Sequence, residues 1–369
     1  MIKTTITFKD IEIMEDLDLN DKEGHWLDLM YLRLRSHRTL FAKGWGDEKL
    51  IKNLIRSNTI HCAPRPINIH FTNQKKEKGL TIYEATFENP FIELPKPKNS
   101  CKAFIEFVIP SGKDLFKKRN DLPLVLIMPA SGDDDLSYRK KKLAFPLAQK
   151  GIASVLLEIP FYGRRKPEGQ ISTNVDLVSD YLLMIYLSIQ EGRSLLNTFY
   201  KNGFPYLGVT GLSMGGFAAG AIASSIPFPT ALVCALTGNT TADTLAYGKC
   251  FENCVWESLT KSDSLNFARK KMHRYFSLLA SLTLLPPPPS LNSALLINAE
   301  DDAYIPKINA LKLKQYWKGV EQIWMPGGHF TTIFKGPSLM VEGLEQAFKK
   351  VPSTRPRTNP FYKEQSFDI

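Results

Sequence analysis

The segment Gly211-Leu212-Ser213-Met214-Gly215-Gly216 contains the pattern Gly-x-Ser-x-Gly. Where a strand precedes this pattern and a helix follows it, the chain makes a sharp turn that exposes the serine hydroxyl. The strand-like run Tyr206–Thr210 precedes it here, and the small, helix-compatible residues of Phe217–Ser225 follow it. Glycines permit the strained turn and the close approach of helix and strand. We therefore predict that Ser213 is a nucleophile, and a purely structural glycine-rich turn is the alternative.

A serine hydroxyl reacts well only when a neighbouring base removes its proton. In the chain order typical of this turn, an acid and then a histidine follow the serine. Only His273 and His329, of six histidines, follow Ser213. His273 adjoins the cationic run Arg269-Lys270-Lys271, and positive charge disfavours the imidazolium that a base must become. His329 lies in a glycine-containing loop after a strand-like run, and we predict that it is the base.

Three consecutive carboxylates, Glu300, Asp301 and Asp302, follow the strand-like run Leu295–Ala299. The common pattern Asp-x-x-Val/Ile-Pro selects Asp302, with Asp301 as the alternative. A carboxylate at this place would hold the histidine in one tautomer and stabilise its charged form.

An ester carbonyl under attack develops a negative oxygen, which two backbone amides can stabilise. One amide should be that of Met214, directly after the nucleophile. The second should come from the loop that follows the apolar run Leu124–Met128. We predict Ala130 or Ser131 as this donor.

Short apolar runs alternate with helix-length segments along most of the chain, which is typical of a mostly parallel sheet covered by helices on both faces. The expected strands are Phe104–Ile109, Leu124–Met128, Ala153–Ile159, Leu207–Thr210, Ala231–Leu236, Ala294–Ile297 and Gln322–Met325. The expected helices are Lys140–Lys150, Asn174–Phe199, Met214–Ser225 and Ile308–Trp317. Together with the serine turn, this α/β pattern predicts the α/β-hydrolase fold with a short helical cap.

The expected organisation has three parts. Residues 1–100 form an N-terminal extension, with a helical segment at 27–55 followed by loops and strands. Residues 101–350 form the core, and residues 239–290 are inserted into it as the cap. Aromatic side chains of the cap either bind an acyl chain or pack onto the sheet. Residues 351–369 form a C-terminal tail.

The formal net charge is +10, with pI ≈ 9.2. Such a charge is either solvated surface or an attraction to an anionic partner, such as a lipid head group or a membrane surface. Arg139 and Lys140 follow the predicted oxyanion loop closely, so they either bind an anionic head group or lie on a solvated helix face. Nucleic acid is not an expected partner, because no binding motif accompanies the charge.

Five cysteines at irregular spacing, without a histidine pair, predict free thiols in a reducing compartment and no zinc site. The acidic start of the chain argues against a secretory signal peptide. No apolar run reaches the roughly 18 residues that a membrane-spanning helix requires. We expect an intracellular protein, peripheral membrane contact at most, and no metal or organic cofactor.

The chain resembles the α/β-hydrolase domain-containing protein 18 family. The matching segments are Phe41-Ala42-Lys43-Gly44-Trp45-Gly46, Ser131-Gly132-Asp133, Tyr162-Gly163-Arg164-Arg165-Lys166-Pro167, the serine turn, Glu300-Asp301-Asp302-Ala303-Tyr304-Ile305-Pro306 and Gly327-Gly328-His329. The resemblance implies a serine hydrolase with the triad Ser213, Asp302 and His329. It also implies mitochondrial association and a lipid acyl ester as substrate, such as a phospholipid of the cardiolipin class. One departure is the run Ala130-Ser131-Gly132-Asp133-Asp134, where the family often has Gly-Thr-Gly-Asp followed by His.

We therefore expect a carboxylic ester hydrolase that works through an acyl-enzyme. An acyl-CoA thioesterase or a peptidase could use the same triad, because the residues around the leaving group decide between these reactions. A non-catalytic binding protein that keeps the fold is the remaining alternative. The sequence leaves the oligomeric state open.

Overall fold

The computed structural model describes residues 24–34, 40–57, 62–116, 122–170, 172–261 and 263–354. Within these ranges, one nine-stranded sheet has the order β1-β2-β3-β5-β4-β6-β7-β8-β9. The strands are β1 His70–Glu77, β2 Leu80–Glu88, β3 Lys102–Ile109, β4 Leu124–Met128, β5 Ala153–Glu158, β6 Leu207–Leu212, β7 Ala231–Ala235, β8 Ala294–Ala299 and β9 Glu321–Met325. This is the α/β-hydrolase fold that the alternation of apolar runs predicts.

The sheet has an antiparallel and a parallel part. β1, β2, β3 and β5 pair antiparallel in that order, and β5, β4, β6, β7, β8 and β9 pair parallel. In the parallel part, Leu126 of β4 lies opposite Val155 of β5 and Val209 of β6. Because parallel strands end at the same edge, the loops after β4, β6, β8 and β9 meet there.

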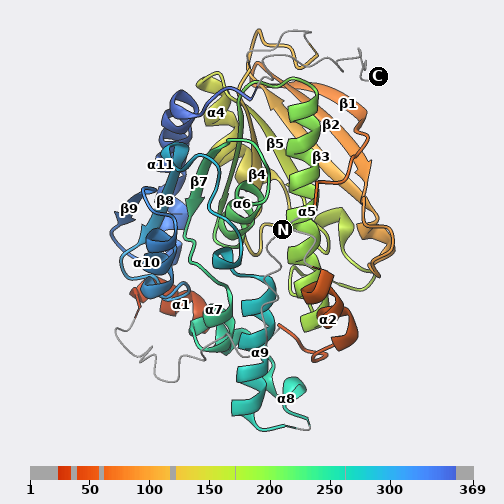
Figure 1. Ribbon diagram of the computed structural model, residues 1–369, viewed down its shortest axis with the longest axis vertical. Helices are drawn as coiled ribbons and strands as arrows, with labels where there is room; N and C mark the ends of the chain where they lie inside the picture. The colour runs from red at the N-terminus through yellow and green to blue at the C-terminus, as the bar shows by residue number, and fades with distance from the viewer. Residues whose placement is uncertain are drawn as a thin grey trace, which may run out of the picture.

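Helices cover both faces of the sheet (Figure 1). The α-helices are α1 Trp26–Leu34, α2 Glu48–Ser57, α3 Ser137–Arg139, α4 Phe145–Gln149, α5 Val178–Lys201, α6 Met214–Ser224, α7 Ala242–Ala246, α8 Trp256–Leu259, α9 Leu265–Leu279, α10 Lys307–Tyr316 and α11 His329–Lys350. A π-helical turn, Lys140–Ala144, joins α3 to α4. Short 3-10 turns span Lys98–Ser100, Gly163–Arg165, Lys249–Asn253, Leu282–Leu284 and Leu291–Ser293.

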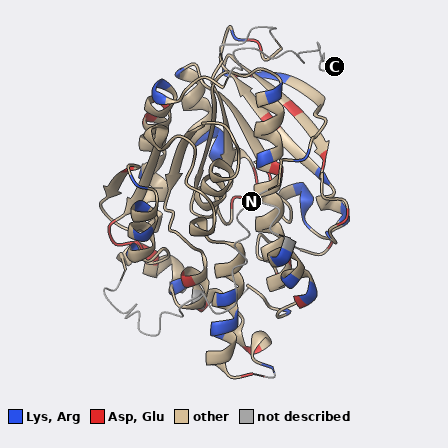
Figure 2. Cartoon of the chain, in the orientation of Figure 1, with Lys and Arg blue, Asp and Glu red and all other residues tan. Residues whose placement is uncertain are grey.

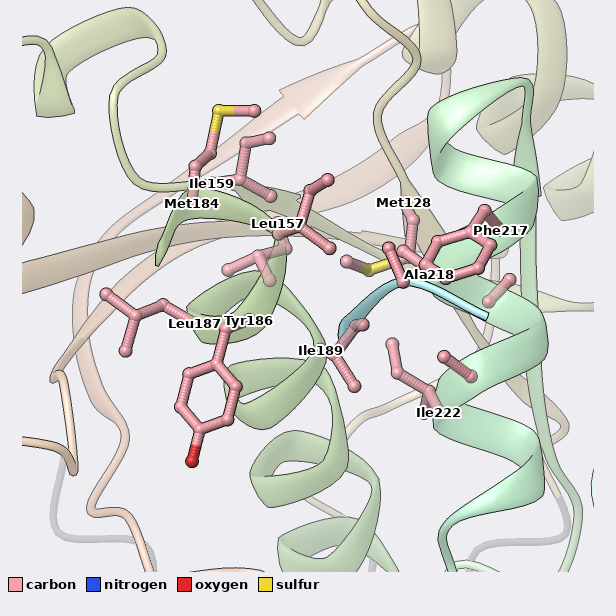
Figure 3. Packing of buried hydrophobic residues seen from close by; sticks show 14 of the residues in the cluster. Met128, Leu157, Ile159, Met184, Tyr186, Leu187, Ile189, Phe217, Ala218 and Ile222 are labelled. Carbon is pink, nitrogen blue, oxygen red and sulfur yellow. The ribbon is translucent and has the colours of Figure 1, made fainter. Parts of the chain in front are cut away.

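The core lies in two layers, one on each face of the sheet. Successive side chains of a strand point to opposite faces, so Leu126 of β4 joins the layer under α5 and α6 while Ile127 joins the layer under α4 and α11. Both residues are fully buried, which explains the continuous apolar runs of the parallel strands. Figure 3 shows Ile189 of α5 in the space between this helix and α6, opposite Ile222. The helix that begins after Ser213 is thus fixed on a packed layer.

The segment between β7 and β8 forms a helical cap, with α7, α8 and α9 at one end of the molecule (Figure 1). Trp256, Met272 and Phe276 of the cap are buried in the same apolar layer as α5 and α6. Phe267 is 53% exposed. The buried cap side chains therefore pack onto the core, which is the second of the two roles that the sequence leaves open for them.

The N-terminal segment joins both the sheet and the cap, so the boundary expected at residue 100 does not match the structure. β1 and β2 are strands of the central sheet, which begins at His70. β1 is mostly exposed and polar, as expected of an edge strand, and therefore lacks the apolar pattern that marks the other strands. The Trp45 indole donates to the Leu259 carbonyl of the cap over 3.0 Å, and Lys271 pairs with Glu48 of α2 over 2.8 Å.

Two other predictions, the helical segment at 27–55 and the C-terminal tail, fall partly on residues outside the described ranges. The helical segment expected at 27–55 is two helices, α1 and α2, and residues 35–39 between them lie outside the described ranges. Of the tail, Thr354 donates its amide to Pro205, whereas residues 355–369 lie outside the described ranges, as do residues 1–23.

In the view of Figure 2, Lys and Arg occur on helices around the sheet and in the cap rather than at one edge. Among the described residues, no helix has the length and apolar character needed to cross a bilayer.

Candidate active site

Ser213 lies on the turn between β6 and α6 with backbone φ 57°, a value that side-chain-bearing residues seldom adopt. Its amide donates to the Ala235 carbonyl over 2.9 Å, which ties the turn to β7. A Cβ at Gly211 would lie 2.2 Å from the Gly215 carbonyl oxygen, and one at Gly215 would lie 2.6 Å from the Met128 carbonyl oxygen. Only glycine fits both positions, so the sequence pattern is a steric requirement of this turn.

His329 contacts Ser213 directly. Its Nε2 lies 3.1 Å from Ser213 Oγ, and its Nδ1 lies 2.9 Å from Oδ2 and 3.1 Å from Oδ1 of Asp302. The side chains of His329 and Asp302 are only 5% and 4% exposed. A continuous hydrogen-bonded chain therefore runs from a buried carboxylate through an imidazole to a serine hydroxyl.

The loop after β8 holds the carboxylate. Asp302 Oδ1 accepts the amides of Tyr304 and Ile305 over 2.8 and 2.9 Å. Asp301 is exposed, and its amide donates to the Gly327 carbonyl over 3.0 Å. The structure thus brings Asp302, rather than the alternative Asp301, to the imidazole.

The other histidine after the nucleophile lies elsewhere. His273 Nε2 lies 2.9 Å from Asp243 Oδ1, and its Nδ1 lies 3.5 Å from Ser277 Oγ, all within the cap. His329 thus lies within hydrogen-bonding distance of Ser213, whereas His273 contacts Asp243 and Ser277 within the cap.

The predicted oxyanion loop lies against the start of α6. Met128 and Pro129 carbonyls face Gly215, and Ser131 Oγ lies 3.7 Å from the sulfur of Met214. The amide of Gly132 donates to the Tyr162 hydroxyl over 3.3 Å. The structure thus places the Ser131 side chain beside that of Met214, at the start of α6.

Arg139 is buried and hydrogen-bonded inside the protein, so it is not placed to bind an anionic head group. Its side chain is 3% exposed, Nε donates to Asp133 over 2.6 Å, and Nη1 donates to the Ile127 and Leu157 carbonyls. Burial raises the pKa of the Asp133 carboxyl, although the Arg139 guanidinium opposes this effect. Arg139 therefore joins the predicted oxyanion loop to the sheet, and its side chain is too buried to meet a head group.

Lys140 is also engaged. Its ammonium pairs with Glu106 of β3 over 2.5 Å, and the two side chains are 16% and 7% exposed. The prediction of an anionic head-group site at Arg139 and Lys140 is therefore wrong, because each side chain is paired with a carboxylate of the protein, Asp133 or Glu106.

A buried ionic network behind the oxyanion loop was not predicted. Arg165 and Glu191 are both fully buried, and the guanidinium donates to both carboxylate oxygens over 2.6 and 2.8 Å. Asn89 also donates to Glu191 over 2.6 Å. The same turn supplies the Gly163 amide, which donates to Asp134 over 2.8 Å. The network thus links the turn after β5 to the oxyanion loop, and the run Arg164-Arg165-Lys166 was its only sequence signal.

Asp28 of α1 is a second residue near the site that sequence reasoning missed. It accepts the amide of His329 over 2.7 Å, although 300 residues of chain separate the two.

Among the described residues, no three His, Cys, Asp or Glu side chains gather in a way that could hold a metal ion.

The sheet order, the strained serine turn after β6 and the loops after β8 and β9 define a member of the α/β-hydrolase class. More narrowly, the chain matches the family described as alpha/beta hydrolase domain containing 18 over residues 38–277 and 262–350. The chain belongs to this family.

Solved structures and curated sequences give more distant likenesses. An acetyl xylan esterase from Paenibacillus sp. R4 has a TM-score of 0.54 and 13% identity, covering 86% of this chain and 98% of that one. Acetyl xylan esterase 1 from Thermoanaerobacterium sp. JW/SL YS485 also has a TM-score of 0.54, with 12% identity and the same two coverages. An uncharacterized protein of Mycobacterium tuberculosis is 22% identical over 290 residues, 73% of this chain. The match spans 64% of that relative's length.

Proposed function

We propose that this chain is a serine hydrolase that cleaves acyl esters through a covalent acyl-enzyme. One observation carries the proposal: the hydrogen-bonded chain from Asp302 through His329 to Ser213, with both nitrogen contacts between 2.9 and 3.1 Å. These distances lie within the range expected of a nucleophile, its base and the group that orients the base.

Each residue has a defined task in this mechanism. Ser213 Oγ attacks the ester carbonyl carbon while His329 Nε2 accepts the hydroxyl proton. The alcohol then leaves with the proton that His329 returns to it, and the acyl group stays on Ser213. A water molecule next attacks this acyl carbon and loses a proton to His329. The bond from the acyl carbon to Ser213 Oγ then breaks, His329 returns the proton to Oγ, and the carboxylic acid is released. Asp302 keeps the proton of the neutral imidazole on Nδ1 and stabilises the imidazolium.

The oxyanion that forms in both steps lies beside the start of α6. The Met214 amide is one donor in this proposal, and an amide at Ala130 or Ser131 is the other. The N-terminus of α6 adds a favourable dipole. Loss of one such donor slows acyl transfer by roughly 10²–10³-fold.

For the substrate we propose a lipid acyl ester, such as a phospholipid of the cardiolipin class. The net charge of +10 supports an anionic substrate or surface, and the family resemblance supports both the lipid and a mitochondrial association. Because Arg139 and Lys140 are engaged inside the protein, any charge attraction must come from other cations.

Labelling with a fluorophosphonate probe tests the nucleophile and its base. Wild-type protein should label, Ser213→Ala should not, and His329→Ala should label at least about 10²-fold more slowly because base catalysis is lost. His273→Ala is the matched control and should label like the wild type, since His273 lies in the cap. A folded wild-type protein that does not react would refute the proposed function and favour a binding protein.

A matched panel of ester, thioester and amide substrates with the same acyl group tests the leaving group. Faster turnover of the thioester or amide than of the ester would replace the ester hydrolase with a thioesterase or a peptidase. Esters presented in cardiolipin-containing and neutral phosphatidylcholine vesicles then test the lipid. Equal rates on both vesicles, at low and high salt, would refute an anionic lipid substrate.

A further inference from the structure

Asp28 is a buried acid on the first described helix, far in sequence from every residue of the triad. It lies in the first turn of α1 and is fully buried. Figure 1 shows α1, in orange-red, close to the end of the sheet where α7 and α10 lie. A buried carboxylate requires hydrogen bonds or an opposite charge to offset its desolvation.

Three backbone amides supply those hydrogen bonds. Asp28 Oδ2 accepts from His329 over 2.7 Å and from Ala303 over 3.1 Å, and Oδ1 accepts from Phe330 over 2.9 Å. His329 and Phe330 are the first two residues of α11, and Ala303 directly follows Asp302. One carboxylate therefore joins the loop of the base to the loop of the acid.

The carboxylate also replaces a missing helix cap. Gly328 at the N-cap of α11 has no side chain to accept the free amides of the first turn. The negative charge of Asp28 satisfies two of these amides and interacts favourably with the positive end of the helix. The position of His329, the first residue of α11, thus depends on a side chain of α1.

The surrounding contacts leave little room for another arrangement. A Cβ at Gly328 would lie 2.3 Å from Asp28 Oδ2, so only glycine permits this approach. The His25 amide donates to the Asp301 carbonyl over 3.0 Å. Tyr31 of α1 stacks on Phe330, with ring centroids 3.9 Å apart and planes at 9°.

From this geometry we infer that Asp28 is a positioning residue, which holds Asp302 and His329 in register by binding the backbone of both loops. Asp28 does not touch Ser213 in this role, and it acts only through the two loops. The inference builds on the proposed function, because it concerns the same triad. An error of about 1 Å in the position of a catalytic group can lower a rate by roughly 10²-fold.

The test compares the rate constant of fluorophosphonate labelling across probe concentrations in the wild type and in Asp28→Asn. The isosteric amide keeps one acceptor oxygen but cannot accept on both sides. We expect the plateau rate to fall about 10–100-fold. The probe concentration that gives half-maximal labelling should stay unchanged, because the contact positions the reacting groups and not the probe.

Asp47→Asn is the matched control. Asp47 Oδ1 accepts the Leu50 amide over 2.9 Å and caps the start of α2, which the triad does not touch. This variant makes the same chemical change at another helix start, so it should lower the thermal unfolding midpoint without changing the plateau rate.

Gly328→Ala disturbs the same contact from the start of α11, and it becomes the test variant if Asp28→Asn does not fold. It should slow labelling similarly, and the double variant should be no slower than the slower single variant. Labelling of either single variant within threefold of the wild type would overturn the inference, as would additive losses, or a loss in Asp28→Asn that appears only as weaker probe binding. A wild type that does not label would instead refute the proposed function.

Discussion

Asp302→Asn is the sharpest test of how the triad works. The carboxamide has nearly the same shape, and its oxygen can still accept the amides of Tyr304 and Ile305 that fix the loop. Its NH2 group would then face His329 Nδ1, which itself carries the proton in the active tautomer. Either two donors meet or the imidazole adopts the opposite tautomer, with a proton on the nitrogen that faces Ser213.

The expected loss in kcat for ester hydrolysis is about 10⁴-fold, which corresponds to about 5.4 kcal/mol of transition-state stabilisation. Asp301→Asn is the matched control and should keep a rate close to the wild type, because the Asp301 side chain is exposed and the imidazole contacts Asp302. Single-turnover kinetics on an activated ester, with the thermal midpoint of each variant, measure both effects. A loss below tenfold in Asp302→Asn, or equal losses in the two variants, would refute the assigned role.

Three further predictions concern stability. Arg165→Met should destabilise the fold by about 3–5 kcal/mol in urea unfolding because it leaves Glu191 buried without its partner, and Arg165→Met with Glu191→Leu should recover much of that loss. Gly215→Ala should both unfold at lower urea and label more slowly, since its Cβ would collide with the Met128 and Pro129 carbonyls of the oxyanion loop. The third prediction concerns acid stability. Burial raises the pKa of Asp243, but its hydrogen bond with His273 and the charge of His273 outweigh this and lower it overall. The pair with His273 therefore stabilises the fold fully above about pH 4, the ordinary pKa of a carboxyl group, and this stabilisation is lost as the pH falls below that value. In Asp243→Asn, the free energy of unfolding should therefore fall less than in the wild type as the pH is lowered through this range.

The parallel strands and the serine turn could be read from the sequence because each leaves a local signal. A strand buried on both faces, such as β4, must be apolar throughout, and Leu124–Met128 is predicted with its exact bounds. The turn at Ser213 needs glycine at fixed offsets for steric reasons, so its pattern is also local. The order of acid and base along the chain then limited the choice to a few residues, from which the described contacts select Asp302 and His329.

The features that were missed depend on distant partners. β1 belongs to the sheet through its pairing with β2, although most of its side chains are exposed and carry no apolar pattern. Arg139 looked like a free cation because the sequence does not reveal that Asp133 and two strand carbonyls surround its guanidinium. The sequence does not single out Asp28, since its partners are backbone amides that any sequence possesses.

Two of these features, the Asp133–Arg139 pair and Asp28, have the same physical role, which is to fix the loops beside Ser213. The loops around Ser213 carry few apolar side chains of their own, so burial alone cannot fix them. Buried carboxylates bind them instead: Asp133 pairs with Arg139, whose guanidinium donates to two strand carbonyls, and Asp28 accepts the amides of Ala303, His329 and Phe330. A carboxylate that accepts several donors leaves fewer orientations open than apolar contact does, because hydrogen bonds are directional. Burying such groups costs solvation energy. We therefore expect them where a loop must be held to within a fraction of an ångström for the reaction to proceed.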